Sequence, residues 1–344
     1  MSAALFSSRL LKWWDANGRK DLPWQQPRSP YRVWVAEIML QQTQVKTVIP
    51  YFEAFIEQFP DIRSLAAASQ DDVLARWSGL GYYARARNLL KTAKICAQEH
   101  DSMLPDSPEA LFKLPGIGES TANAIYSQSS NHPATVLDGN VKRVLSRYFA
   151  IEGWSGTSRI HKQLWDAASK LLPDHRGADY TQAIMDLGAT VCARSKPQCD
   201  LCPVNDDCKA FQTDTVAHYP TPRPKIKIHN KTLHMLIIPD DKGRVLLERR
   251  PPAGIWGGLW TLPMEENAET LVHRLGVGQQ DTNKLPNLNH QLTHMKMTIC
   301  PIIGKTGSCA KGVECTSDQQ WFSNNEWPQL GLPRPVRQLL ETYL

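Results

Sequence analysis

Leu114-Pro115-Gly116-Ile117-Gly118-Glu119-Ser120-Thr121-Ala122 places two glycines immediately before an apolar segment that begins with Asn123-Ala124-Ile125. Gly116 and Gly118 let the backbone turn tightly and expose amide N–H groups at the start of the following helix. Such N–H groups can receive a phosphate without a basic side chain. A Gly-x-Gly turn alone is a common connection between helices, so its interpretation depends on the rest of the chain.

The chain around this turn is mainly helical from Ser8 to about Ala210, because apolar residues recur at helical spacing and proline-containing turns separate the segments. Residues 219–225 are rich in proline and basic residues, which predicts an extended linker. Strand-like runs follow, beginning at 233–238 and 245–248. We therefore expect a mainly α domain at 1–215, a linker at 216–230 and an α+β domain at 231–344.

The composition is that of a globular protein, since 42% of the 344 residues are hydrophobic and 21% are charged. The net charge of +5 permits binding to phosphate backbones but does not establish it. Residues 1–9 lack the apolar core of a signal peptide, and no apolar run is long enough to span a bilayer. We expect a cytoplasmic protein, whose 8 cysteines need a role other than forming disulfides.

Half of these cysteines lie in one polar loop at 192–208, with the pattern Cys192-x6-Cys199-x2-Cys202-x5-Cys208. Four thiolates so close in sequence are typical of a tetrahedral zinc site or an iron–sulfur cluster. Zinc ribbons usually contain two Cys-x2-Cys pairs, whereas this loop has one. The spacing therefore favours an iron–sulfur cluster.

Two carboxylates stand out on chemical grounds. Asp138 lies where an apolar segment meets a helix start, which is typical of an N-cap and compatible with a catalytic role. Lys142 and Arg143 follow one turn later, and we expect their charges to keep Asp138 ionised. Glu37 interrupts the apolar run 33–40, so it is either buried with a raised pKa, as a general acid requires, or on the outer face of an amphipathic helix.

Together these features resemble the endonuclease III superfamily of helix-hairpin-helix DNA glycosylases, and most closely its MutY-type adenine DNA glycosylases. The resemblance covers essentially the whole chain. It rests on Pro23-Trp24, 34–45, 79–89, the glycine turn, 137–144, 185–189 and the cysteine loop. It implies a 4Fe–4S cluster held by the four cysteines, and residues near Gln42 and Tyr82 that wedge into the base stack. It also implies DNA contacts near Gly116, Gly118, Ser120 and Lys142.

The resemblance implies a mechanism for the two carboxylates. Glu37 protonates an extruded adenine and activates water, Asp138 stabilises the oxocarbenium-like sugar, and Asn140 orients Asp138 or the sugar phosphate. Bifunctional relatives carry a lysine nucleophile where this chain has Ser120, and a hydroxyl cannot form a Schiff base. We therefore expect a monofunctional enzyme. The alternative is a bifunctional endonuclease III-like glycosylase with abasic-site lyase activity.

The C-terminal region resembles the Nudix-like domain of this family, best at 250–260. The stretch 268–276 lacks the acidic cluster that binds magnesium in Nudix hydrolases, which favours recognition of the base opposite adenine. Thr293 and His294 keep the hydroxyl and imidazole of the family's lesion-contacting Phe-Ser-His loop, while Leu292 replaces its aromatic ring. The expected partner is double-stranded DNA with an A·8-oxoguanine or A·G mispair, bound by a monomer in the bacterial nucleoid.

Overall fold

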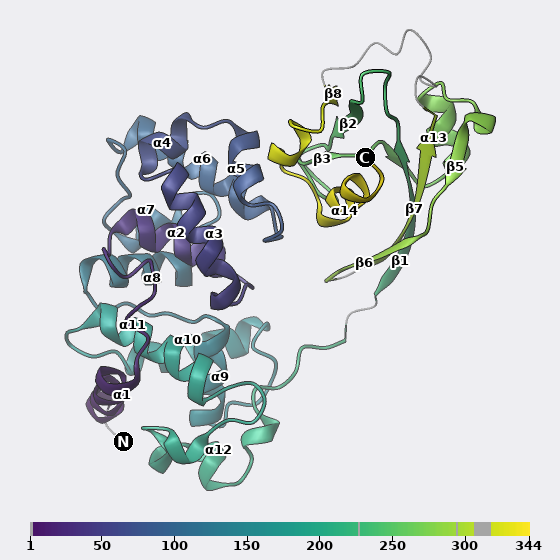
Figure 1. Cartoon of the computed structure of the whole chain (residues 1–344). Helices are drawn as coiled ribbons and strands as arrows, with labels where there is room; N and C mark the ends of the chain where they lie inside the picture. The colour runs from purple at the N-terminus through teal and green to yellow at the C-terminus, as the bar shows by residue number, and fades with distance from the viewer. Residues whose placement is uncertain (1–2, 226–227, 294, 306–317) are drawn as a thin grey trace. The chain divides into compact units, whose positions relative to one another are not determined.

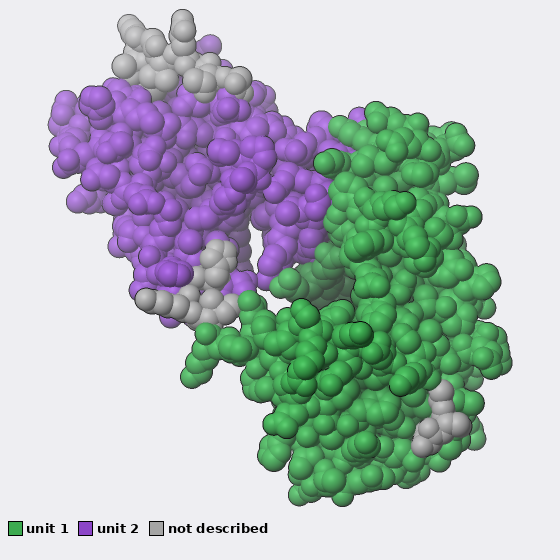
Figure 2. Space-filling model, turned by 180° about the vertical axis from the view of Figure 1, so that it is seen from behind, with its two compact units in different colours: residues 1–66, 91–225 green, residues 67–90, 226–344 purple. Residues whose placement is uncertain are grey.

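The protein is described by a computed structural model that covers residues 3–225, 228–293, 295–305 and 318–344. The chain folds into two compact units (Figures 1 and 2). The first contains residues 1–66 and 91–225, and the second contains residues 67–90 and 226–344. Each unit is considered by itself below.

The first unit is helical, and a helical segment at 67–90 contributes to the second. Local sequence signals start several helices, for example at Ser29, whose side chain accepts a hydrogen bond from the Arg32 amide while Pro30 occupies the first helical turn. The helices up to residue 212 are α1 (Ala3–Asn17), α2 (Pro30–Leu40), α3 (Val45–Gln58), α4 (Ile62–Ala67), α5 (Gln70–Arg76), α6 (Ala84–Glu99), α7 (Pro108–Phe112), α8 (Glu119–Ser130), α9 (Gly139–Tyr148), α10 (Ser158–Lys170), α11 (Gly177–Asp186) and α12 (Lys209–Gln212).

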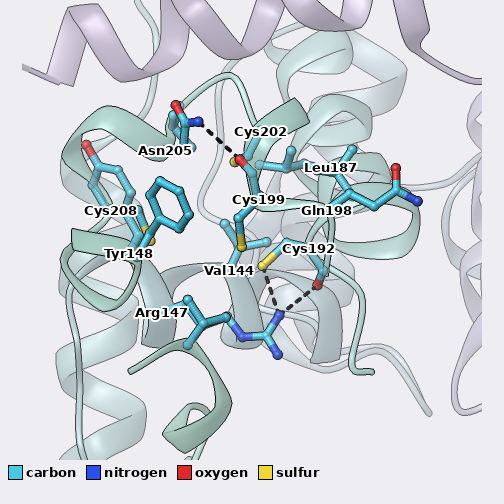
Figure 3. Close-up of a pocket in the computed structure, with 14 residues that line it drawn as sticks. Val144, Arg147, Tyr148, Leu187, Cys192, Gln198, Cys199, Cys202, Asn205 and Cys208 are labelled. Carbon is cyan, nitrogen blue, oxygen red and sulfur yellow. Dashed lines mark hydrogen bonds between the residues drawn. The ribbon is translucent and has the colours of Figure 1, made fainter. Parts of the chain in front are cut away.

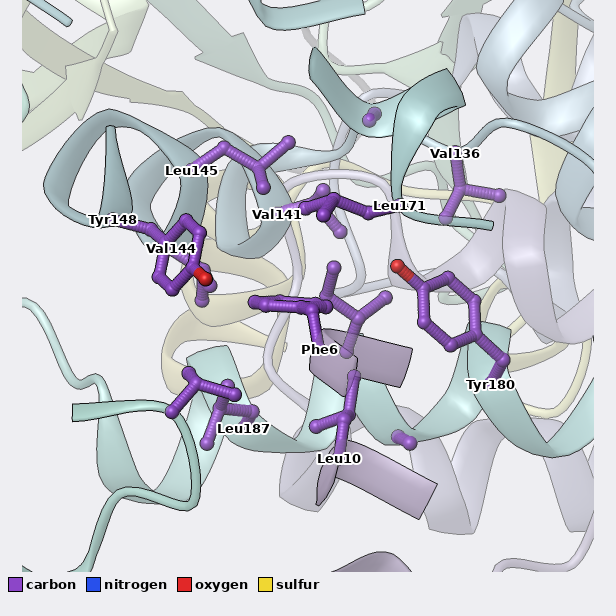
Figure 4. Packing of buried hydrophobic residues seen from close by; sticks show 14 of the residues in the cluster. Phe6, Leu10, Val136, Val141, Val144, Leu145, Tyr148, Leu171, Tyr180 and Leu187 are labelled. Atoms are coloured by element: carbon purple, nitrogen blue, oxygen red, sulfur yellow. The ribbon is translucent and has the colours of Figure 1, made fainter. Parts of the chain in front are cut away.

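A hydrophobic core joins α1, α9, α10 and α11 (Figure 4). Phe6 of α1 is fully buried and packs edge-on against Tyr148 of α9, with ring centroids 4.9 Å apart. Val141 and Leu145 of α9 are also fully buried in this cluster. Burial of this apolar face fixes the position of α9, and therefore of Asp138 at its N-terminus.

In the described residues beyond 228, the second unit contains two sheets and the helices α13 (Ala268–Arg274) and α14 (Arg334–Tyr343). In the larger sheet β1 pairs in parallel with β7, and the strand order is β4-β1-β7-β5 with β6 also paired to β7. The smaller sheet has the order β3-β2-β8. The strands are β1 (His229–Ile237), β2 (Val245–Arg249), β3 (Trp260–Thr261), β4 (Met264–Glu265), β5 (Thr282–Lys284), β6 (Leu288–Leu292), β7 (Met295–Gly304) and β8 (Gln319–Phe322).

The predicted fold class, a mainly α N-terminal part and an α+β C-terminal part, is confirmed. Residues 67–90 group with the C-terminal sheets, which sequence order could not indicate, and the first unit continues through the proline-rich stretch to Lys225. The domain limits expected from the sequence stay a prediction. Among the described helices, none has both the length and the apolar character needed to cross a membrane.

Candidate active site

Asp138 is the N-cap of α9, as the sequence predicts. Its Oδ1 accepts a hydrogen bond from the Val141 amide at 2.7 Å, and its Oδ2 accepts one from Asn140 Nδ2 at 3.2 Å. Gly139 beside it is exposed. The cap therefore holds the carboxylate rigidly at the edge of a surface that a ligand can reach.

The electrostatic environment of Asp138 differs from the expectation. Burial raises its pKa above the ordinary value, and this effect outweighs the hydrogen bonds from Val141 and Asn140 and the attraction of Arg143. Lys142 is itself half-buried, and burial lowers its pKa although the charge of Asp138 opposes that shift. Arg143 thus acts in the expected direction, but its effect is smaller than that of burial. Desolvation decides the direction of the pKa shift of Asp138, and the spacing of charged residues in the sequence does not indicate desolvation.

Glu37 lies on α2 and is not on a solvated outer face. Gln128 of α8, itself buried, donates a hydrogen bond from Nε2 to Glu37 Oε1 at 2.8 Å. Burial raises the pKa of Glu37 to about 7, the hydrogen bond from Gln128 opposes this shift, and the negative charge of Asp138 adds to it. Only part of its side chain remains accessible to solvent. Glu37 and Asp138, distant in sequence, are thus electrostatically coupled in one site.

Sequence reasoning missed Gln128. The sequence offered little indication of its role, because a glutamine side chain near the end of a helix of small and polar residues is ordinarily solvated. Here its side chain is buried and its amide positions the carboxyl group of Glu37. Removal of the amide would leave the Glu37 carboxyl without this donor.

Arg143 connects the first turn of α9 to the cysteine loop. Its Nη2 donates to Asn140 Oδ1 at 2.9 Å and to the Gly188 carbonyl at 2.6 Å, while its Nε donates to the Cys192 carbonyl at 2.8 Å. A Cβ on Gly188 would lie 2.6 Å from Asn140 Cβ, so this close approach requires glycine. Asn140, and through it Asp138, is therefore held by two segments of the chain.

The glycine turn joins α7 to α8 and has the predicted hairpin geometry. Gly116 has φ +79°, which favours glycine, and Gly118 is the N-cap of α8. Both glycines are exposed, and a Cβ at Gly118 would meet nothing, so the amide groups there stay uncovered. Ser120 Oγ accepts a hydrogen bond from the Leu137 amide at 2.8 Å. The second helix of the hairpin thus contacts the residue before Asp138.

The structure brings together two of the predicted lesion-contacting residues. The hydroxyl groups of Tyr82 and Thr293 lie 2.9 Å apart, and both residues belong to the second unit. Tyr82 is 47% exposed and has φ +50°, and the Arg85 guanidinium lies 5.6 Å from its ring centroid. Gln42, between α2 and α3 of the first unit, is also exposed with a positive φ, of 58°. His294 lies outside the described residues.

The four cysteines of the loop line one pocket, together with side chains of α9 and the π-helical turn Leu187–Val191 (Figure 3). Arg147 of α9 donates from Nη1 to Cys192 Sγ at 3.3 Å and to the Ala193 carbonyl at 2.8 Å. Across the described residues, no three His, Cys, Asp or Glu side chains stand close enough to hold a single metal ion. The four thiols thus lie on the wall of one pocket beside α9.

A family model for HhH-GPD superfamily base excision DNA repair proteins matches residues 35–170, and a NUDIX domain model matches residues 234–342. The adenine DNA glycosylase of Buchnera aphidicola subsp. Acyrthosiphon pisum is 38% identical over 346 residues, which cover 100% of this chain and 99% of that protein. This chain belongs to the adenine DNA glycosylases.

This glycosylase is a DNA repair hydrolase, and the resemblance seen in its sequence is confirmed. The human adenine DNA glycosylase is 42% identical over 216 residues, which cover 60% of this chain and 42% of the human protein. A thermostable thymine-DNA glycosylase aligns with a TM-score of 0.56 and 26% identity, over 61% of this chain and 97% of that one. Endonuclease III in a non-covalent DNA complex aligns with a TM-score of 0.52 and 21% identity, over 60% of this chain and 94% of that one. This alignment supports a shared fold.

Proposed function

We propose that this glycosylase excises adenine paired with 8-oxoguanine or guanine, and that it acts without a covalent lysine intermediate. The observation that carries the proposal is the coupled pair Glu37 and Asp138, in which burial raises the pKa of Glu37 to about 7. A carboxyl group with this pKa holds a proton near neutral pH and can donate it. The pair matches the division of roles between two carboxylates in glycoside hydrolysis.

Proton transfer drives the proposed reaction. Adenine is extruded from the duplex, and Glu37 donates a proton to the purine ring while the bond from C1′ to the base nitrogen breaks. The bonding electrons leave with the base, and Asp138 stabilises the positive charge that develops at C1′. Glu37, now ionised, accepts a proton from water as the hydroxide adds to C1′. Asn140 keeps Asp138 oriented through its hydrogen bond.

The second unit supports recognition of the opposite base rather than nucleotide hydrolysis. Among the residues of α13 only Glu269 is acidic. The nearby Glu248 and Glu265 both pair with Arg274, at 2.6 and 3.1 Å. Both carboxylates therefore already form ion pairs with one guanidinium. The contact between Tyr82 and Thr293 instead supports a surface for the damaged partner base.

The residues of the loop at 192–208 fit a 4Fe–4S cluster. The donors are four thiols on the wall of one pocket. In a 4Fe–4S cluster each of four cysteine thiolates binds a different iron, so the number and type of donors match. Cys192, Cys199, Cys202 and Cys208 would hold the cluster, which would supply a rigid cross-link of the loop. Arg147 would donate a hydrogen bond to one of the ligating sulfurs.

We expect iron and acid-labile sulfide in the purified protein, at about four of each per chain, as a cubane cluster requires. The measurement is elemental analysis with sulfide determination after anaerobic purification. Cys202→Ser should lower the iron content, whereas Cys96→Ser, at a buried thiol outside the loop, should not. Stoichiometric zinc without iron would refute the cluster.

We expect the enzyme to leave an intact abasic site. Ser120 contacts the Leu137 amide and offers no amine, while Lys142 lies close enough to interact with Asp138. Any trapped adduct should therefore be minor and should disappear in Lys142→Ala. Ser120→Lys should introduce strand cleavage, with slower base release because the Leu137 amide loses its acceptor.

The measurement for this prediction is a denaturing gel of duplexes with adenine opposite 8-oxoguanine, guanine or thymine, run with and without alkali. Cleavage of the first two duplexes only after alkali is the expected result. Strand nicking by the wild type as fast as base release would favour the bifunctional alternative. Equal cleavage opposite thymine would contradict the proposed mispair specificity.

A further inference from the structure

A basic groove crosses the first unit beside the cysteine loop. It encloses about 760 Å³, and its lining includes Gly139 and Lys142 of α9, Arg194 and Lys196 of the loop, Trp154, and Arg223 of the proline-rich stretch. Pockets of this size hold whole ligands. Because Gly139 is adjacent to Asp138, one end of the groove lies next to the proposed active site.

The proline-rich stretch is fixed to the first unit along this groove. The buried Arg147 donates from Nε to the Tyr219 carbonyl at 3.0 Å, and the Gly153 amide donates to Thr221 Oγ1 at 2.9 Å. The Arg223 guanidinium lies 5.7 Å from the ring centroid of Trp154. Prolines at 220, 222 and 224 further restrict the backbone. Residues 219–223, part of the stretch that the sequence predicts as an extended linker, thus form a fixed wall of the groove.

The charges in the groove select for an anion. Two lining cations, Arg143 and Arg147, are bonded to backbone carbonyls. The other four are exposed or half-buried: Lys142, Arg194, Lys196 and Arg223. The one acidic residue of the lining is Asp214. In the described part of the chain, no ion pair joins Arg194, Lys196 or Arg223 to a carboxylate. Lys196 also has φ +51°, a strained backbone conformation that presents its side chain at the surface.

We propose that residues 219–223, with Arg223 held over Trp154, are part of the DNA-binding surface and contact the phosphodiester backbone of the duplex. A backbone phosphate is the ligand that a long basic groove beside a DNA-processing site fits best. Arg223 supplies the charge, and Trp154 limits the motion of its side chain. This inference rests on the proposed action on duplex DNA.

The test measures the affinity for an undamaged duplex by fluorescence anisotropy over a range of salt concentrations. Each phosphate contact contributes a slope of about 0.9 to the dependence of log K on log salt. Arg223→Ala should therefore lower affinity about eightfold at 0.1 M salt and reduce the slope by about one. Arg223→Lys should keep the slope, and Trp154→Ala should weaken binding because Arg223 loses its support.

Arg63→Ala is the matched control, since Arg63 is an exposed arginine on α4 that does not line the groove and its loss changes the net charge equally. Equal affinities and slopes for Arg223→Ala and Arg63→Ala would overturn the proposal. Binding of the mononucleotide dAMP in the groove without any effect on duplex binding would also overturn the proposal, because such binding would identify a small-ligand pocket. Undamaged DNA makes this readout independent of adenine release, so failure of the proposed function and failure of the groove remain distinguishable.

Discussion

Asp138→Asn is expected to bind mispaired duplex and to release adenine about a thousandfold more slowly than the wild type. The amide can still cap α9, because asparagine is as good an N-cap as aspartate. What is lost is the negative charge opposite C1′, and a loss of about 4 kcal/mol of transition-state stabilisation corresponds to this factor. The measurement is the single-turnover rate on an A·8-oxoguanine duplex with enzyme in excess.

Asp61→Asn is the matched control for this variant. Asp61 also accepts a hydrogen bond from a helix N-terminus, from the Ser64 amide at 2.8 Å, but on the exposed start of α4. It should release adenine at the wild-type rate. An Asp138→Asn rate within a few-fold of the wild type would remove Asp138 from the mechanism.

Glu37→Gln is expected to lose base excision by a factor of about 10² to 10⁴, the usual contribution of a general acid. The glutamine oxygen can still accept the hydrogen bond from Gln128, so the local geometry is kept. The proton on the carboxyl group is lost. The exposed Glu53→Gln, on α3, is the control and should be fully active. Retained excision by Glu37→Gln would mean that another group protonates adenine.

The pH dependence provides a second measurement for the same residue. Because the pKa of Glu37 is raised to about 7, the fraction of protonated enzyme falls as pH rises through 7, and the wild-type single-turnover rate should fall with it. A raised folded-state pKa also means that ionisation of Glu37 costs stability above its ordinary pKa of 4.5. Glu37→Gln should therefore unfold at a higher temperature than the wild type at pH 8. This difference should shrink toward pH 4.5.

Local features of the sequence were sufficient to determine several parts of this protein. The glycine turn, the N-cap at Asp138 and the spacing of the four cysteines depend on neighbours within a few residues, so their geometry follows from backbone conformation and helix capping. The change from helical spacing of apolar residues to short strand-like runs likewise indicated the fold class, because each type of element has its own pattern and length of apolar residues.

The tertiary structure decided the properties that depend on residues far apart in the chain. Glu37 has a raised pKa because packing buries it and the negative charge of Asp138 adds to the shift, whereas its own segment was equally compatible with a solvated face. The contact between Tyr82 and Thr293 and the grouping of residues 67–90 with the C-terminal sheets are long-range events that no periodicity encodes. Residues 219–223 have a linker's composition and become a wall because Arg147, Gly153 and Trp154 bind them. Desolvation and long-range hydrogen bonding depend on three-dimensional packing, which is why only the fold could reveal them.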